Sequence, residues 1–307
     1  MAVKAVQMSD LVDAYLAMRR VAGYALLREG ADLRKFAKFC AEKGVRHVAT
    51  KLAIQWAERT PSRWLRVNRL RTISHFAEYA RAEDGRHEVP PLRCLGTYRY
   101  RRPTPYILSR AQIDALLREA GNMGPKGTLR PQILQTLFAL IAVTGLRISE
   151  ALGLTLSDVG PTGLVVRKSK FGKGRVLPIH SSTWAALESY ISRRRQVPSE
   201  DDHLFISLTG KVLRRHTVEE IFRELVDAAG IPRKPRIRGP VIHSLRHTFA
   251  VRALEASTGS SSAVAEHMLA VSRYLGHSDV VHTYWYYEST PQLMRAIARL
   301  SERAGGR

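Results

Sequence analysis

Apolar side chains recur every three or four residues through the first 85 positions, which is the spacing of one helix face. Ser9, Thr50 and Ser62 precede such runs and are suited to cap helices. The apolar positions are Leu11, Tyr15, Met18, Leu33, Phe36, Phe39, Cys40, Ile54, Trp56, Leu65, Leu70, Ile73, Phe76 and Tyr79. The pattern predicts a small helical bundle, of about four helices, over residues 1–85.

The periodicity is lost between residues 86 and 107. Prolines stand there among several arginines, including Arg101 and Arg102. A proline-containing stretch without apolar periodicity indicates a loop. We therefore predict a basic linker between two domains, which either follows a nucleic-acid backbone or is an ordinary positively charged spacer.

A second domain is expected over residues 108–307. Its pattern is mainly helical, but two β-type runs, LVVRK and RVLPI, flank the glycine-containing SKFGKGR between residues 163 and 179. This arrangement predicts an antiparallel hairpin. Residues 291–304 read as an amphipathic C-terminal helix. The fold class is thus predicted as mostly α (α+β), with a small antiparallel β-sheet in the second domain.

The charge balance points to a polyanionic partner. Of 307 residues, 49 are Lys or Arg and 27 are Asp or Glu, a formal net charge of +22. Such an excess favours nucleic acid as the partner. The longest apolar run, Leu137 to Val143, is too short to cross a bilayer, and Cys40 and Cys94 lack metal-ligand spacing. We expect a cytoplasmic, nucleoid-associated protein with no membrane partner.

Five short segments carry residues suited to phosphodiester chemistry. They are TGLRISEAL with Arg147, SKFGKGR with Lys170, HSLRHTFA with His243 and Arg246, LGHSD with His277, and TYWYY with Tyr286. In this order, with the H-x-x-R spacing and nine residues from His277 to Tyr286, they resemble the tyrosine recombinase (phage integrase) family. The resemblance implies a SAM-like helical core-binding domain at 1–85, a linker at 86–107 and a catalytic domain at 108–307.

The resemblance also implies a site-specific recombinase that cuts and rejoins DNA through a covalent 3′-phosphotyrosine, with no metal, ATP or other cofactor. The implied catalytic residues are Arg147, Lys170, His243, Arg246, His277 and the nucleophile Tyr286. Their chemistry is coherent, because attack on a phosphodiester builds negative charge that guanidiniums can stabilise. A phenol with an ordinary pKa of about 10 needs such cations nearby.

For the general acid and for the nucleophile, residues nearby in the sequence are also candidates. Lys168 and Lys173 compete with Lys170 for the general acid, since the register of a hairpin shifts easily. Tyr287 lies about 100° from Tyr286 on a helix and competes with it for the nucleophile. The family pattern favours Lys170 and Tyr286.

Two further residues are assigned supporting roles. His247 stands four residues after His243, a metal-ligand spacing, but no Glu or Cys accompanies the pair. We therefore predict no metal, and His247 is interpreted as a core or supporting residue. Glu150, one helical turn after Arg147, is expected to support its helix.

The partner is expected to be double-stranded DNA carrying a specific recombination site. The predicted DNA contacts are Arg63, Arg66, Arg69, Arg101, Arg102 and Lys173. Strand exchange implies a homodimer on one site and a tetramer across two, and the C-terminal helix docks either on a neighbouring protomer or on its own domain. The rival hypotheses are a type IB topoisomerase and a catalytically idle DNA-binding protein.

Overall fold

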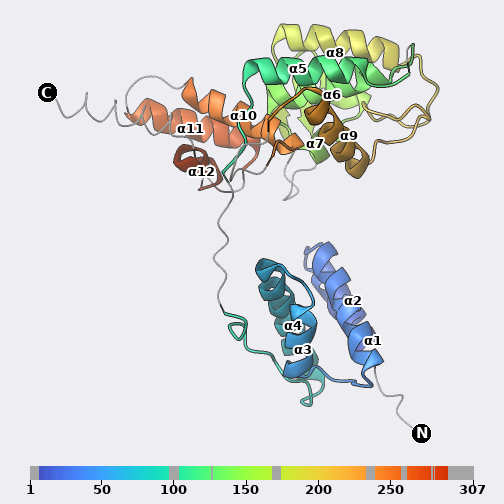
Figure 1. The fold of residues 1–307 in the computed structure, drawn as a ribbon, viewed down its shortest axis with the longest axis vertical. Coiled ribbons are helices and arrows are strands. Elements are labelled where there is room, and N and C mark those ends of the chain that lie inside the picture. Colours follow the sequence, from blue (N-terminus) through green and yellow to red (C-terminus); the bar gives the residue numbers. More distant parts are fainter. Residues whose placement is uncertain are drawn as a thin grey trace, which may run out of the picture. The chain divides into compact units, whose positions relative to one another are not determined.

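The computed structural model describes residues 7–96, 104–125, 127–167, 174–232, 239–256, 261–277, 279 and 281–289. The chain divides into two compact units, Met1–Arg102 and Pro103–Arg307, and Figure 1 shows the elements of each. The predicted fold class is confirmed, since helices dominate and the described strands form one small antiparallel sheet. None of the described helices is both long and apolar enough to cross a membrane.

The first unit is built from helices whose apolar faces meet in one core. The described helices are α1 (Met8–Val21), α2 (Leu27–Glu42), α3 (Thr50–Glu58) and α4 (Arg63–Glu83). Leu16, Phe36 and Phe76 are fully buried between them. Ser62 caps α4 as predicted, and its hydroxyl accepts the Leu65 N–H at 3.4 Å. Ser9 and Thr50 instead lie inside the first turns of α1 and α3.

The chain after α4 returns to the bundle. The Glu88 N–H donates to the Val48 carbonyl at 2.8 Å, and the Ser74 hydroxyl donates to the Pro90 carbonyl at 2.8 Å. These bonds satisfy buried backbone groups. Residues 86–90 belong to the predicted linker, and these bonds hold them against the first unit.

The second unit combines helices with the small sheet. Its described helices are α5 (Arg110–Asn122), α6 (Arg130–Thr144), α7 (Ile148–Leu152), α8 (Ser181–Arg194), α9 (Arg215–Ala228), α10 (Ile242–Glu255), α11 (Ser261–Leu275) and α12 (Val281–Ser289), with the 3-10 helix η1 (Leu156–Asp158). The strands β1 (Val159–Gly160), β2 (Gly163–Val166) and β3 (Arg175–Leu177) pair antiparallel in that order. The predicted hairpin is confirmed as β2–β3, and its connection, residues 168–173, lies outside the described residues.

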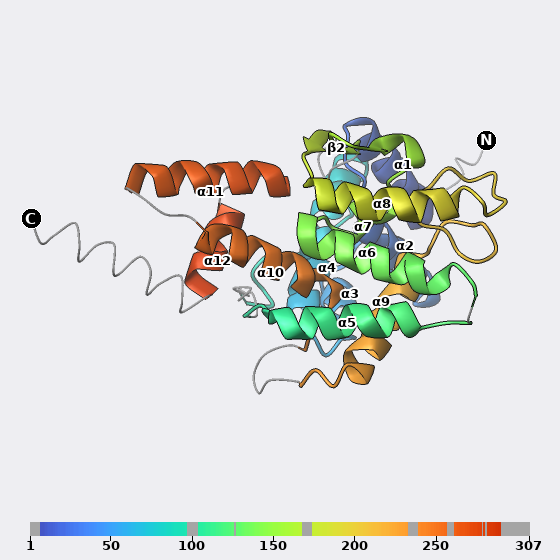
Figure 2. The same ribbon diagram turned by 90° about the horizontal axis from the view of Figure 1, so that it is seen from above.

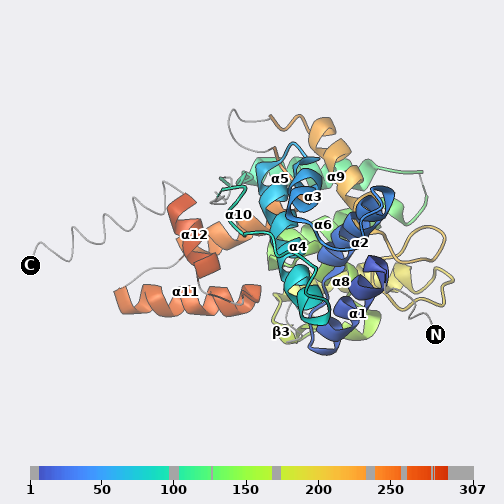
Figure 3. The same cartoon turned by 90° about the horizontal axis from the view of Figure 1, so that it is seen from below.

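Two apolar clusters stabilise the second unit. The larger one lies among α5, α6, α8, α9 and the sheet, with Phe138 and Phe222 in edge contact at its centre. The smaller one joins α10, α11 and α12 and contains Leu254, Val271 and Tyr286. Figure 2 and Figure 3 show these three helices gathered together. The segment richest in tyrosines is thus packed against the HSLRH segment of α10.

Candidate active site

The turn between α6 and α7 places Arg147. Gly145 ends α6 with a φ of 64°, a left-handed conformation that glycine adopts without strain. Its small size matters as well, because a Cβ at this position would lie 2.5 Å from Cδ1 of Phe249. After this turn Arg147 is the N-cap residue of α7, and its Nη2 donates to the carbonyl of Gly276 at 3.0 Å.

Arg246 on α10 reaches the same turn. Its Nη1 donates to the Gly145 carbonyl at 2.6 Å and its Nη2 to the Leu275 carbonyl at 2.8 Å. The side chain is 1% exposed. Burial, followed by the charge of Arg147, lowers the pKa of Arg246 to about 10. Arg246 therefore stays protonated at neutral pH.

A buried carboxylate, Glu150, joins three guanidiniums. Arg147 Nη1 donates to its Oε1 at 2.8 Å, Arg175 donates to both oxygens at 3.0 and 2.9 Å, and Arg246 Nη1 lies 4.0 Å from Oε2. Burial alone would raise the pKa of Glu150, but the hydrogen bonds from Arg175 and the Arg147 backbone outweigh it and lower the pKa to about 2. Three cations around one anion leave a positive excess suited to a phosphate.

A second glycine turn places His277. Gly276 follows α11 with a φ of 66°, and a Cβ there would lie 2.6 Å from Nη1 of Arg175. Arg175 also donates from Nε to the Tyr274 carbonyl at 3.0 Å, which ties β3 to the end of α11. His277 Nδ1 lies 2.8 Å from the hydroxyl of Thr283 on α12. This contact links the turn to the helix of the tyrosines.

Both predicted site histidines are neutral at pH 7. Burial, followed by the charges of Arg246 and Arg147, lowers the pKa of His277 to about 3. The same causes lower the pKa of His243 to about 4. The His243 residue is exposed to solvent by surface area, so the desolvation of its ring comes from the protein atoms packed around it rather than from full enclosure. A neutral imidazole has one N–H donor and one accepting lone pair, so each ring can donate to an oxygen or accept a proton.

Tyr286 lies on α12 with its ring inside the smaller core. The residue is 2% exposed, and its ring stacks near that of His277, with centroids 6.3 Å apart and an interplanar angle of 16°. The hydroxyl lies 3.0 Å from Nδ1 of His247. Negative charge on this oxygen opposes the lowering of the Arg246 pKa by burial and Arg147, so the oxygen is within electrostatic reach of that guanidinium.

The described residues bring together most of the predicted catalytic set. Arg147, His243, Arg246, His277 and Tyr286 converge at the meeting of the α6–α7 turn, α10 and α12. Outside the described residues lie Lys170, Lys168, Lys173, Arg101, Arg102 and the side chain of Tyr287. The choice of lysine and the choice between the two tyrosines stay predictions.

The arginines of α4 that were predicted to contact DNA have different surroundings. Arg63 is exposed. Arg66 donates from Nε to the Thr60 carbonyl at 2.6 Å. Arg69 lies over the Trp56 ring, 4.7 Å from its centroid, with its side chain 20% exposed. Arg63 is therefore the best placed of the three for an external anion, whereas Arg69 is engaged within the bundle.

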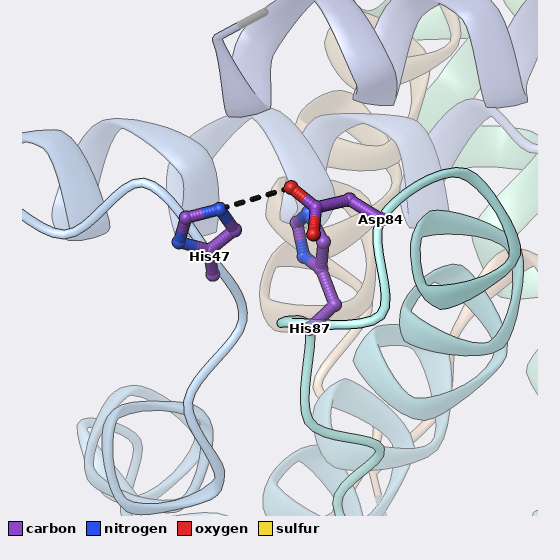
Figure 4. A group of neighbouring side chains, drawn as sticks. All are labelled: His47, Asp84 and His87. Carbon is purple, nitrogen blue, oxygen red and sulfur yellow. Dashed lines mark hydrogen bonds and ion pairs between the residues drawn. The ribbon is translucent and has the colours of Figure 1, made fainter. Parts of the chain in front are cut away.

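Hydrogen bonds within the chain engage the first of two candidate metal-ligand groups. Among the described residues these groups are His47, Asp84 and His87, and Asp201, Asp202 and His203. Figure 4 shows the first group, in which His47 Nε2 lies 3.2 Å from Oδ2 of Asp84. His87 Nδ1 accepts the Val48 N–H at 3.0 Å, and Arg86 Nη2 donates to Asp84 at 2.7 Å. Because that His87 lone pair is engaged and Asp84 already has a cation, neither is preorganised for a metal.

Three residues that contact the candidate active site are not in the predicted catalytic set. They are His247, Arg175 and Thr283. The spacing of four residues after His243 does put His247 near the same helix face, but only the packing of α12 on α10 brings it to Tyr286. Arg175 carries no local sign of its role, because its partner Glu150 lies 25 positions earlier in the chain.

Comparison with known proteins agrees with this geometry. The model of the phage integrase family matches residues 107–292. The protein y4rB of Sinorhizobium fredii, whose name describes an integrase or recombinase, is 36% identical over 304 residues, covering 95% of this chain and 96% of y4rB.

Two solved structures share the fold. The XerH site-specific recombinase bound to palindromic difH substrate has a TM-score of 0.67 at 17% identity, covering 96% of this chain and 85% of XerH. A lambda integrase tetramer bound to a Holliday junction has a TM-score of 0.66 at 16% identity, covering 92% and 78%. Since the family model spans more than half of the chain and y4rB aligns over nearly all of it, this protein belongs to the phage integrase family, as its five segments predicted.

Proposed function

We propose that this protein is a site-specific DNA recombinase, an enzyme that cuts and rejoins DNA strands through a covalent 3′-phosphotyrosine without metal or ATP. The observation that carries the proposal is the convergence of two guanidiniums, two neutral imidazoles and one tyrosine hydroxyl in a chain of the phage integrase family.

The guanidiniums are assigned to the scissile phosphate. When the Tyr286 oxygen attacks phosphorus, negative charge builds on the nonbridging oxygens, and preorganised cations stabilise it. A guanidinium has five N–H donors, and the contacts described above engage two in Arg147 and two in Arg246. Further donors of both side chains can therefore bind phosphate, while Glu150 holds Arg147 and the Gly145 and Leu275 carbonyls hold Arg246.

The remaining roles follow from protonation state. His243 and His277 are neutral, so each can donate one N–H to a phosphate oxygen. Lys170 is assigned as the general acid that protonates the departing 5′ oxygen, with Lys168 and Lys173 as alternatives from the same hairpin connection. The nucleophile is Tyr286, with Tyr287 as the alternative.

The functions of the two units are assigned from the family resemblance. Residues 108–307 are assigned as the catalytic domain, residues 1–85 as the core-binding domain and residues 86–107 as the basic linker. Exposure supports Arg63 as a phosphate contact. Arg101, Arg102 and Lys173 are assigned to DNA from their sequence positions alone.

The partner is double-stranded DNA carrying a recombination site. XerH is bound to its difH substrate, and lambda integrase forms a tetramer on a Holliday junction. Exchange between two duplexes cuts four strands, so a chain with one nucleophile works as a dimer on each site and as a tetramer across two. Such a protein acts at the nucleoid.

The experiment first recovers the DNA site and then tests the tyrosine. The protein is incubated with sheared, nicked DNA from the replicon that carries its gene, and covalent complexes that survive SDS are captured and their DNA sequenced. A nicked, labelled duplex with the recovered site then shows the adduct on a denaturing gel. We expect Tyr286→Phe to abolish the adduct and Tyr287→Phe to retain it.

Other outcomes decide between the rivals. An adduct lost in Tyr287→Phe and kept in Tyr286→Phe would reassign the nucleophile. Relaxation of supercoiled plasmid lacking the recovered site would favour a type IB topoisomerase. DNA binding with no adduct on any nicked fragment would favour a catalytically idle DNA-binding protein.

A further inference from the structure

His247 contacts the oxygen of the proposed nucleophile. Its Nδ1 lies 3.0 Å from the Tyr286 hydroxyl, and the two ring centroids are 5.5 Å apart at 63°. The imidazole also packs against Trp285, with centroids 5.2 Å apart, and against His243, with centroids 4.4 Å apart. These ring contacts fix the imidazole so that Nδ1 faces the hydroxyl.

We propose that His247 is a catalytic residue that accepts the phenolic proton of Tyr286 as the tyrosine attacks DNA. The inference rests on the proposed function, because it names the base for that reaction. A phenol is a weak nucleophile while protonated, and a base within hydrogen-bond distance of the proton is the first geometric requirement for general base catalysis.

The proposed step balances. As the Tyr286 oxygen bonds to phosphorus, the bond from phosphorus to the 5′ oxygen breaks, and the phenolic proton moves to Nδ1 of His247. The departing 5′ oxygen takes its proton from the general acid, the role proposed for Lys170. In rejoining, the 5′ hydroxyl attacks phosphorus and returns its proton to the general acid. The bond from phosphorus to the tyrosine oxygen breaks, and the proton on Nδ1 of His247 returns to that oxygen.

The charged and titratable groups around the pair fit this role. The described residues place His243 on α10 and His277 beside Tyr286, both neutral, so a newly charged His247 meets no protonated imidazole. Arg246 interacts electrostatically with the Tyr286 oxygen and favours the developing phenolate.

The experiment measures single-turnover cleavage of the nicked duplex recovered as described above. His247→Asn keeps a short polar side chain but removes the basic nitrogen, and His247→Ala removes both. The matched control is His216→Asn, which alters an exposed histidine on α9. We expect both His247 variants to cleave about 100-fold more slowly or worse, with unchanged affinity for the duplex, while His216→Asn keeps the wild-type rate.

Two further readouts separate a base from a structural role. The dependence of the cleavage rate on pH should differ between the wild type and His247→Asn, because only the wild type has a titratable group at position 247. The defect of His247→Asn should also shrink when position 286 carries a fluorinated tyrosine that is already ionised at the assay pH, because that nucleophile needs no base.

Three outcomes would overturn the proposal. His247→Asn cleaving at the wild-type rate would reduce His247 to a packing role. Faster cleavage by either variant would mean that the hydrogen bond restrains Tyr286 in a resting position. A defect unchanged by the fluorinated tyrosine would mean that orientation alone is lost. If the wild type forms no adduct, the proposed function itself fails, which the Tyr286→Phe comparison reports separately.

Discussion

Glu150 is the side chain through which the guanidiniums of the site are held. Its carboxylate is buried and accepts hydrogen bonds from Arg147 and Arg175, while Arg246 lies 4.0 Å away. An ion pair that loses one member leaves the other charge buried without compensation, which costs more than the pair contributes. The arrangement therefore makes the stability of the fold and the geometry of the site depend on one residue.

Removing the Glu150 charge should destabilise the protein. We expect Glu150→Gln to lower the free energy of unfolding by about 3 kcal/mol, measured by urea denaturation, and to weaken binding of the site DNA less than it slows cleavage. The control is Glu219→Gln, which breaks the exposed Arg215–Glu219 pair on α9 and should cost about 0.5 kcal/mol or less. Equal losses in the two variants would contradict this role of Glu150.

The neutral histidines make stability depend on pH. The folded-state pKa values of His243 and His277, about 4 and about 3, lie below the ordinary value of 6.5. As pH falls below 6.5 the unfolded chain binds protons that the folded chain does not, so the free energy of unfolding decreases. We expect His277→Asn to flatten this decrease between pH 6.5 and pH 5 in urea denaturation. If the free energy of unfolding of His277→Asn falls with pH in parallel with that of the wild type, His277 does not have a lowered pKa in the folded chain.

At the scale of elements, two glycine turns decide where the site residues stand. Gly145 lets α6 end beside α10, and Gly276 lets α11 end against Arg175. Each turn also exposes a carbonyl that a site arginine binds, Gly145 for Arg246 and Gly276 for Arg147. The turns thus supply both the chain reversal and the hydrogen-bond acceptors that orient the two guanidiniums.

A methyl group at Gly145 should lower the free energy of unfolding by more than the backbone strain of the left-handed conformation alone. Gly230, after α9, has a similar φ of 61°, but a Cβ added there would meet no atom of the described residues within 4 Å. Gly230→Ala therefore isolates the strain, about 1–2 kcal/mol. We expect Gly145→Ala to cost about 1–3 kcal/mol more, because its Cβ collides with Phe249 and Leu275. Thermal unfolding of both variants tests this. Equal losses of stability in the two variants would show that Phe249 and Leu275 move aside without an energetic penalty.

At the scale of the whole molecule, positive charge dominates. The formal net charge is +22, yet single arginines differ in what they can do. Arg63 faces solvent on α4, whereas Arg69 lies against Trp56 and near Asp32 in the bundle. Charge counted along the chain therefore overstates the charge available to DNA.

The salt dependence of DNA binding should separate these two arginines. We expect Arg63→Ala to weaken binding and to reduce the slope of log affinity against log salt by about 0.9, the change for one phosphate contact. Arg69→Ala should leave the slope unchanged and lower the unfolding temperature, because it removes packing on Trp56. Fluorescence anisotropy over a salt series measures the first effect, and a slope that responds only to Arg69→Ala would reverse the assignment.

The family, the fold class and the residue types of the site can be predicted from the amino-acid sequence, because each depends on local patterns of residues. Helical periodicity predicted the bundle, the glycine-containing run predicted the β2–β3 hairpin, and five spaced segments predicted the family. Which of these side chains come into contact is visible only in the folded chain. Three contacts join residues that are separated along the chain: Arg175 with Glu150, Arg69 with Trp56 in the bundle, and His247 with Tyr286. Such contacts depend on how the helices pack, which no local sequence pattern specifies.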